Sequence, residues 1–106
     1  MTRWAVGLLL VGALSGCGST TNSDWQQANL EGTVGAYQQF LDHHPGGAQA
    51  DEARSRILAL QDQQAWTEAL STNTAESYQQ YLQKEPGGSH VRDAHEHIVA
   101  LASAAA

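Results

Sequence analysis

Apolar side chains recur along this chain with the spacing of helices rather than of strands. Tyr78, Tyr81 and Leu82 lie three and four residues apart, which places them on one face of an α-helix. The same spacing begins at Tyr37 in the first half of the chain. No segment alternates apolar and polar residues for long enough to indicate a strand. The pattern therefore predicts an all-α protein.

Caps and turn residues divide the apolar pattern into five expected helices. Thr74 is a favourable N-cap residue, and Pro45 and Pro86 are each expected to end the helix before them. Residues 48–73 contain neither glycine nor proline, so we expect one long helix there; a kink near residues 61–64 is the alternative. The expected helices are residues 24–31, 33–43, 48–71, 74–84 and 89–102.

The chain repeats itself with a period of 41 residues and without a gap. Of the 36 residue pairs from Trp25/Trp66 to Leu60/Leu101, 14 are identical. Periods of 20–50 residues are typical of stacked supersecondary units, none of which can bury its apolar face alone. We therefore expect residues 24–103 to form a short α-solenoid or helical bundle of two repeats.

Two groups of residues are expected to shape this repeat domain. The large apolar residues of the helical stripes are predicted to form its core: Trp25, Tyr37, Leu41, Ile57, Leu60, Trp66, Tyr78, Leu82, Ile98 and Leu101. The Pro-Gly-Gly sequence, which occurs twice, is predicted to form its turns: Pro45, Gly46, Gly47, Pro86, Gly87 and Gly88. The alternative for Trp25 and Trp66 is that their rings are exposed and bind a partner instead of packing between the helices.

The repeat resembles a known family of helical repeats. The pattern Thr-x3-Tyr-x2-[Phe/Tyr]-Leu-x3-Pro-Gly-Gly-x5-Ala-x3-Ile is similar to the second helix, turn and next first helix of tetratricopeptide (TPR) repeats. It is most similar to divergent versions in bacterial envelope proteins, among them outer-membrane assembly lipoproteins. The period of 41 departs from the usual 34, and the Trp-x2-Leu-Gly-x2-Tyr signature is missing. The resemblance implies a TPR-like, protein-binding domain, but it transfers no binding residues.

The first residues of the chain have the pattern of a targeting signal. Arg3 supplies a positive charge, and the apolar stretch of residues 5–14 follows it. That stretch is shorter than the roughly 20 residues that a membrane-spanning helix needs, but it suits a signal peptide. The segment ends in Leu14-Ser15-Gly16-Cys17, which resembles the lipobox of bacterial lipoproteins. A secretory signal with a chance cysteine is the alternative.

The lipobox resemblance implies where the mature protein resides. Cleavage between Gly16 and Cys17 would remove residues 1–16, and acyl chains such as palmitate on Cys17 would insert into the lipid bilayer. Gly18 in place of aspartate resembles an outer-membrane address, so we expect a periplasm-facing outer-membrane lipoprotein. The small polar residues that follow are expected to make 17–23 a lipidated, flexible tether. Cys17 is the only cysteine, which excludes an intramolecular disulfide.

The charge balance argues against two kinds of binding partner. The chain from Cys17 onward has four basic and eleven acidic side chains. Such an excess of carboxylates argues against binding to nucleic acid and against lying flat on anionic lipid. Any membrane attachment therefore depends on Cys17.

The histidines are the main candidates for a metal site, and their pattern does not favour one. His95 and His97 lie about 200° apart on a helix, and neither an HExxH motif nor a second cysteine is present to complete a zinc site. His90 and His97 are nearly in line on one face. His43 and His44, at a helix end, are expected to complement the helix dipole. We expect neither a metal nor a cofactor.

The sequence also lacks the signatures of an enzyme. It contains no glycine-rich phosphate loop, no nucleophile elbow and no pair of carboxylates on an apolar background. Two repeats are fewer than the three or more that usually complete a repeat core. We therefore expect an open apolar face that a partner protein or a second copy of the chain covers. The first hypothesis is an interaction or scaffold module for an unidentified envelope protein. The alternatives are a structural lipoprotein that forms homodimers and, third, a histidine-dependent metal-binding protein.

Overall fold

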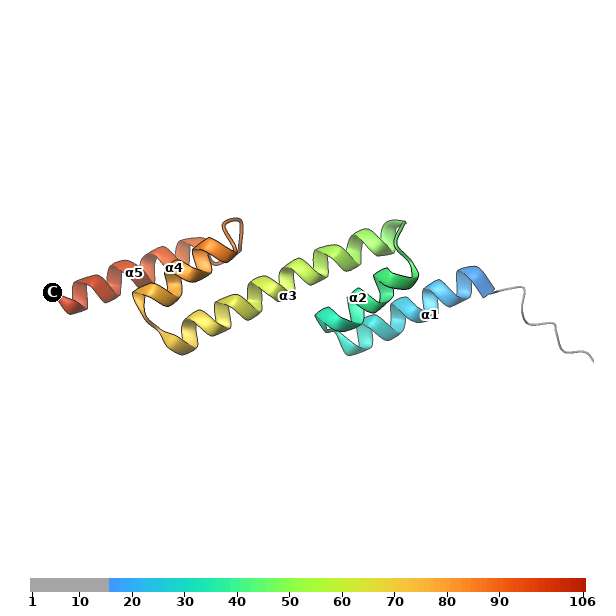
Figure 1. Cartoon of the computed structure of the whole chain (residues 1–106), viewed down its shortest axis with the longest axis horizontal. Helices are drawn as coiled ribbons and strands as arrows, with labels where there is room; N and C mark the ends of the chain where they lie inside the picture. The colour runs from blue at the N-terminus through green and yellow to red at the C-terminus, as the bar shows by residue number, and fades with distance from the viewer. Residues whose placement is uncertain (1–15) are drawn as a thin grey trace, which may run out of the picture. The chain divides into compact units, whose positions relative to one another are not determined.

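The computed structural model describes residues 16–106, which form α-helices joined by short turns (Figure 1). The described residues contain no strand, which confirms the all-α prediction. Residues 1–15, which hold most of the predicted signal peptide and the start of the predicted lipobox, lie outside them, so cleavage and acylation of Cys17 stay predictions. The helices are α1 (Gly16–Glu31), α2 (Val34–His43), α3 (Ala48–Thr72), α4 (Ala75–Lys84) and α5 (Val91–Ala105).

The described residues divide into two compact units, residues 16–54 (unit 1) and 55–106 (unit 2). Unit 1 contains α1, α2 and the beginning of α3, whereas unit 2 contains the rest of α3 together with α4 and α5. Helix α3 is continuous from Ala48 to Thr72. The expectation of one long helix is therefore confirmed, and the residues considered for a kink are helical.

The second helix of each repeat begins at a threonine. Thr33 Oγ1 accepts a hydrogen bond from Ala36 N, and Thr74 Oγ1 accepts one from Ser77 N, both at 3.0 Å. Ser77 Oγ also accepts a bond from Thr74 N at 3.1 Å, which completes a capping box in α4. The predicted N-cap at Thr74 is thus confirmed. Position 36 is alanine, so α2 has only half of this arrangement.

The helix before each of these caps ends in the same way. Gly32 and Asn73, which are 41 residues apart, both adopt the left-handed conformation, with φ of 63° and 53°. Their amides donate to Ala28 O and Ala69 O, each at 2.8 Å. Glycine and asparagine are the residues that tolerate this conformation best, and one such residue stops a helix. The repeat therefore sets where α1 and α3 end.

The first helix begins earlier than predicted. Residues 18–23 belong to α1, whereas the sequence suggested a flexible tether before residue 24. Polar side chains in this segment bond to other elements of unit 1: Thr21 Oγ1 lies 3.3 Å from His44 Nδ1, and Gln49 Nε2 donates to Asn22 Oδ1 at 3.3 Å. A search for apolar periodicity could not detect a helix that polar contacts hold in place.

The last helix differs from its prediction at both ends. It begins at Val91 rather than Ser89 and continues to Ala105, three residues beyond the expected end. The added residues are mostly alanine, which has the highest helix propensity of any residue. The expected end at residue 102 gave too little weight to that propensity.

The residues predicted as core occupy a range of environments. Tyr37, Ile57, Trp66 and Tyr78 are buried, whereas Trp25, Leu41, Leu60, Leu82, Ile98 and Leu101 are half-buried. In unit 2 one cluster contains Trp66, Ala69, Tyr78, Tyr81 and Ala94, with Leu82, Ile98 and Leu101 packed against it. Alanines make up half of the buried apolar residues in the described chain. Small side chains at these positions allow the helices to approach closely.

Candidate functional site

Each unit carries a groove between two helices, and the repeat builds both grooves from equivalent positions. Groove 1, between α1 and α2, is lined by Asp24, Gln27, Ala28, Glu31, Ala36, Gln39, Phe40 and His43. Groove 2, between α3 and α4, is lined by Ala65, Glu68, Ala69, Thr72, Ser77, Gln80, Tyr81 and Lys84. Every residue of groove 2 follows its counterpart in groove 1 by 41 positions. The volumes are about 210 Å³ for groove 1 and about 80 Å³ for groove 2.

The floors of the two grooves are alike. In groove 1 the floor consists of Ala28, Ala36 and Phe40, all of them buried. Phe40 packs against Trp25, with ring centroids 5.1 Å apart. In groove 2 the corresponding aromatic ring, that of Tyr81, lies 5.2 Å from the ring of Trp66. A small buried residue on each helix and one aromatic ring thus form the base of each groove.

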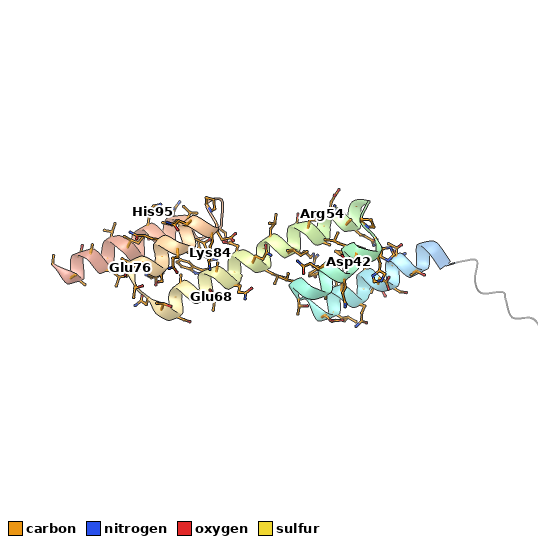
Figure 2. The ribbon with its side chains drawn as sticks, viewed as in Figure 1. Asp42, Arg54, Glu68, Glu76, Lys84 and His95 are labelled. Atoms are coloured by element: carbon orange, nitrogen blue, oxygen red, sulfur yellow. The ribbon has the colours of Figure 1, made fainter. Side chains whose placement is uncertain are left out.

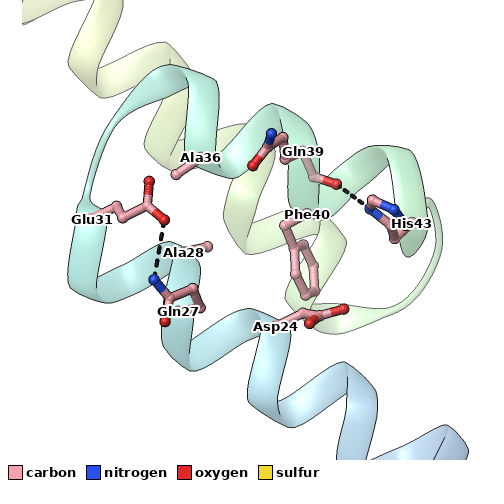
Figure 3. Close-up of a pocket in the computed structure, with 8 residues that line it drawn as sticks. All are labelled: Asp24, Gln27, Ala28, Glu31, Ala36, Gln39, Phe40 and His43. Carbon is pink, nitrogen blue, oxygen red and sulfur yellow. Dashed lines mark hydrogen bonds between the residues drawn. The ribbon is translucent and has the colours of Figure 1, made fainter.

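The rim of groove 1 is polar and acidic. Figure 3 shows Asp24, Gln27 and Glu31 along α1, opposite Gln39 and His43 on α2. Gln27 Nε2 donates to Glu31 Oε1 at 3.2 Å, and His43 Nδ1 bonds to the main-chain oxygen of Gln39 at 3.0 Å. No lysine or arginine lines this groove. Its mouth therefore carries two carboxylates without a strong cation of its own.

The rim of groove 2 contains an ion pair. Lys84 Nζ, on α4, lies 3.8 Å from Glu68 Oε2 on α3; Figure 2 labels both residues. These residues occupy the positions of His43 and Gln27 in groove 1. The two long side chains reach across the mouth from opposite helices, which is consistent with the smaller volume of groove 2.

A histidine and an aspartate hold the end of α2 against α1 in unit 1. His44 Nε2 lies 2.8 Å from Asp24 Oδ2, and the ring of His44 packs on Phe40 with centroids 5.0 Å apart. Asp24 is itself one of the residues that line groove 1. The contact therefore positions both Phe40 in the floor and Asp24 in the rim.

A buried carboxylate organises the polar cluster of unit 2. Tyr81 O–H donates to Asp62 Oδ1, and Ser89 donates to Asp62 Oδ2 from its amide at 3.0 Å and its hydroxyl at 2.7 Å. His90 N–H in turn donates to Tyr81 Oη at 3.1 Å. Both carboxylate oxygens are thus engaged in joining α3 to α4 and to the turn before α5.

Burial and these hydrogen bonds shift the pKa values of Asp62 and Tyr81. Burial alone would raise the pKa of Asp62, but the hydrogen bonds from Tyr81 and Ser89, with a contribution from His90, lower it below its ordinary value. Burial and the bond to Asp62 raise the pKa of Tyr81 to about 12. Asp62 is therefore a charged anchor of the fold at neutral pH.

Two histidines near α5 pack on aromatic rings: His90, which precedes the helix as its N-cap, and His97 within it. His90 stacks on Trp66 with ring centroids 4.7 Å apart, and His97 stacks on Tyr78 at the same separation. His95 is exposed on α5 (Figure 2). Within residues 16–106, no group of three or more histidine, cysteine, aspartate or glutamate residues is arranged to hold a metal ion.

The sequence contained a signal for Asp62 and for the grooves, but neither was recognised as a site. Asp62 precedes Trp66 by four residues, which places both on one face of α3. Ala28 and Ala69 are identical small residues at one repeat position, which is the signal that the sequence carries for the groove floors. The rims could not be found by identity, because apart from Gln39 and Gln80 the two copies carry different residues there.

No helix among residues 16–106 is both long enough and apolar enough to cross a membrane. Comparisons with protein-family models, with curated proteins and with solved structures give no match for this chain.

Proposed function

We propose that this protein is a membrane-anchored envelope lipoprotein whose TPR-like helices act as a non-catalytic protein-interaction module. Acylated Cys17 attaches the chain to the periplasmic face of the outer membrane. The helical repeats then bring a partner protein to that membrane. The mechanism is placement rather than chemistry.

One observation carries the proposal: the repeat builds the same groove twice. All eight lining positions coincide after a shift of 41 residues, and each groove combines a buried floor with an exposed rim. Packing explains why the floors match. It does not explain exposed rims that differ in charge, whereas repeat proteins use extended surfaces of this kind to bind their partners.

The chemistry of the grooves favours binding over catalysis. Two residues of the groove floors carry a hydroxyl, Tyr81 and Ser77. The Tyr81 hydroxyl donates to Asp62 Oδ1. Ser77 Oγ donates to the main-chain oxygens of Ala69 at 3.0 Å and Thr74 at 2.8 Å. It is therefore engaged in capping α4 rather than paired with a base. The remaining floor residues are alanines and aromatic rings, which offer contact area but no nucleophile.

Site-specific photo-crosslinking in intact cells tests the proposal. A photoreactive residue replaces Gln39 in groove 1 or Gln80 in groove 2, and Gln38 and Gln79, exposed neighbours outside the linings, are the matched controls. We expect a discrete adduct with another envelope protein from at least one groove position and none from the controls. The absence of an adduct above the controls from both grooves would overturn the proposal.

Self-association is a second candidate, because one exposed apolar position recurs. Leu58 and Val99 lie 41 residues apart, and their exposed fractions are 65% and 64%. Sedimentation of the full chain in detergent micelles over a wide concentration range tests this function. A dimer that Val99→Glu dissociates would support it, whereas a monomer at all concentrations would exclude it.

Metabolic labelling tests the membrane anchor separately. The wild-type chain should incorporate labelled palmitate, and Cys17→Ser should abolish the incorporation. Label that persists in the variant would place the acyl chain elsewhere and contradict the lipobox assignment.

A further inference from the structure

We propose that groove 1 receives a lysine or arginine side chain from the partner protein, an assignment that rests on the proposed function. The occupant is a basic segment of another protein. Its charge pairs with the acidic rim, and its aliphatic part lies on the groove floor.

The rim of groove 1 has the charge that a basic side chain requires. Asp24 and Glu31 are seven residues apart on α1, or about two turns and 10 Å along the helix axis, so they flank the groove at both ends. Asp24 Oδ2 is engaged with His44 Nε2 at 2.8 Å, whereas the described partner of Glu31 is the neutral amide of Gln27. The amides of Gln27 and Gln39 contribute hydrogen-bond acceptors between them (Figure 3). A guanidinium or ammonium group can bond to a carboxylate and an amide oxygen at once.

The floor of groove 1 suits the rest of such a side chain. Lysine and arginine bury their methylene stems on apolar surfaces while the charged group stays near water. Ala28 and Ala36 supply a shallow apolar surface, and Phe40 adds an aromatic ring in the same floor. A cation within about 6 Å of such a ring gains a further attraction.

Groove 2 provides an internal precedent for this arrangement. There the chain's own Lys84 approaches Glu68 across the mouth, at 3.8 Å. The equivalent residues in groove 1 are His43 and Gln27, so this intramolecular pair does not form there. Groove 1, at about 210 Å³ against about 80 Å³, thus keeps the room that the lysine reduces in groove 2.

The charge of unit 1 favours the same occupant. Its described residues, 16–54, include five carboxylates and a single strong cation, Arg54. The guanidinium of Arg54 donates to Asp51 Oδ1 at 3.2 Å and to Pro45 O at 2.7 Å, away from the groove. A surface with this excess of negative charge accelerates the approach of a basic partner and repels an acidic one.

The test uses the full chain in uncharged detergent micelles and two synthetic peptides. One is a twelve-residue peptide of glycine and serine with two arginines; the other carries citrulline, a neutral analogue of similar shape, in their place. Binding is followed by ¹H–¹⁵N NMR. We expect the arginine peptide to shift resonances of α1 and α2 around groove 1 and to bind at least about ten-fold more tightly than the citrulline peptide. Added salt should weaken this binding severalfold.

Matched variants assign the effect to the groove. Glu31→Gln should weaken binding about two- to five-fold, the range expected for one exposed charge. Glu76→Gln removes the same charge from an exposed site outside the grooves and should leave binding unchanged. Gln27→Glu combined with His43→Lys reproduces the ion pair of groove 2. The added negative and positive charges cancel, so the net charge stays the same. It should reduce binding more than Glu31→Gln does.

Each contrary outcome has a distinct meaning. Equal binding of the two peptides, or shifts outside groove 1, would overturn the assignment of a basic occupant. A dimer that Glu31→Gln dissociates would show that a second copy fills the groove instead. If Gln39 crosslinks in cells to a segment without lysine or arginine, this inference fails while the interaction function stands. If neither groove crosslinks, the interaction function itself fails.

Discussion

Unit 1 and unit 2 share an aromatic frame but differ in what covers it. The Trp25 and Tyr37 rings lie 5.8 Å apart, and the Trp66 and Tyr78 rings 5.7 Å apart. In unit 2 the rings of His90 and His97 also contact the tryptophan, which is 6% exposed, whereas Trp25 is half-buried. The two ring pairs therefore pack at similar distances, but the tryptophan of unit 2 is more deeply buried than that of unit 1.

The polar contacts, like the aromatic ones, enclose unit 2 more than unit 1. Asp62 receives three hydrogen bonds, which tie α3 to α4 and to the turn before α5, whereas the hydroxyl of the equivalent residue, Thr21, lies 3.3 Å from His44 Nδ1. Groove 2 carries its own lysine, and groove 1 does not. Unit 2 is therefore the more closed of the two units, and the groove of unit 1 is the larger, at about 210 Å³ against about 80 Å³.

Truncation of the tryptophans should produce the largest difference between the units. Trp66→Ala removes a buried ring from four aromatic contacts and should lower the free energy of unfolding by about 3–5 kcal/mol. Trp25→Ala should cost less, because its ring is half-buried. Hydrogen exchange resolved by segment measures each unit separately. Equal loss of protection in the two variants would contradict the difference in enclosure.

Removal of the buried carboxylate should have the next largest effect. Asp62→Ala leaves the Tyr81 hydroxyl and the Ser89 amide without their acceptor, which should cost about 1–3 kcal/mol. Thr21→Ala is the matched change in unit 1 and should cost less than about 1 kcal/mol. Urea unfolding followed by circular dichroism compares them. A larger loss for Thr21→Ala would reverse the assignment of the stronger anchor.

The stability of unit 2 should depend on pH at both ends of the scale. Because folding lowers the pKa of Asp62, its contribution is complete above the ordinary aspartate pKa of about 4 and is lost as the pH falls through the lowered value. Because folding raises the pKa of Tyr81 to about 12, its contribution is complete below about pH 10 and is lost between pH 10 and 12. Carboxyl ¹³C titration by NMR checks the first of these. A pKa of Asp62 at or above 4 would contradict it.

The helices were predictable from the sequence to the extent that local rules set their limits. Residues 48–73 lack a helix breaker, and α3 is accordingly continuous. Thr74 was recognised as a cap because the N-cap preference is a local property. The start of α1 was missed, because the contacts of Thr21 with His44 cross 23 residues of sequence.

The candidate site was harder to predict for the same reason. The groove floors contain alanines, which carry little weight in an apolar pattern, and the rims combine residues from two helices. Asp62 lies in a polar stretch that was considered only for a kink, and its partners Tyr81 and Ser89 follow 19 and 27 residues later. Which polar residue meets which depends on how the helices pack, and periodicity within one helix does not contain that information.

The smallest expected difference concerns the helix caps. Ser77→Ala removes the hydroxyl that accepts from Thr74 N at 3.1 Å and donates to Ala69 O and Thr74 O. Both oxygens keep a main-chain donor, Asn73 N and Tyr78 N, and α4 is left with the single cap bond that α2 already has. The loss should be about 0.5–1.5 kcal/mol, the usual value of one hydrogen bond. The reciprocal change, Ala36→Ser, supplies the missing half of the box in α2 and should slow exchange of the Thr33 amide. Unchanged exchange of the Thr74 amide in Ser77→Ala would show that the capping box contributes nothing to the stability of α4, and the two units would then differ only in their aromatic and acidic contacts.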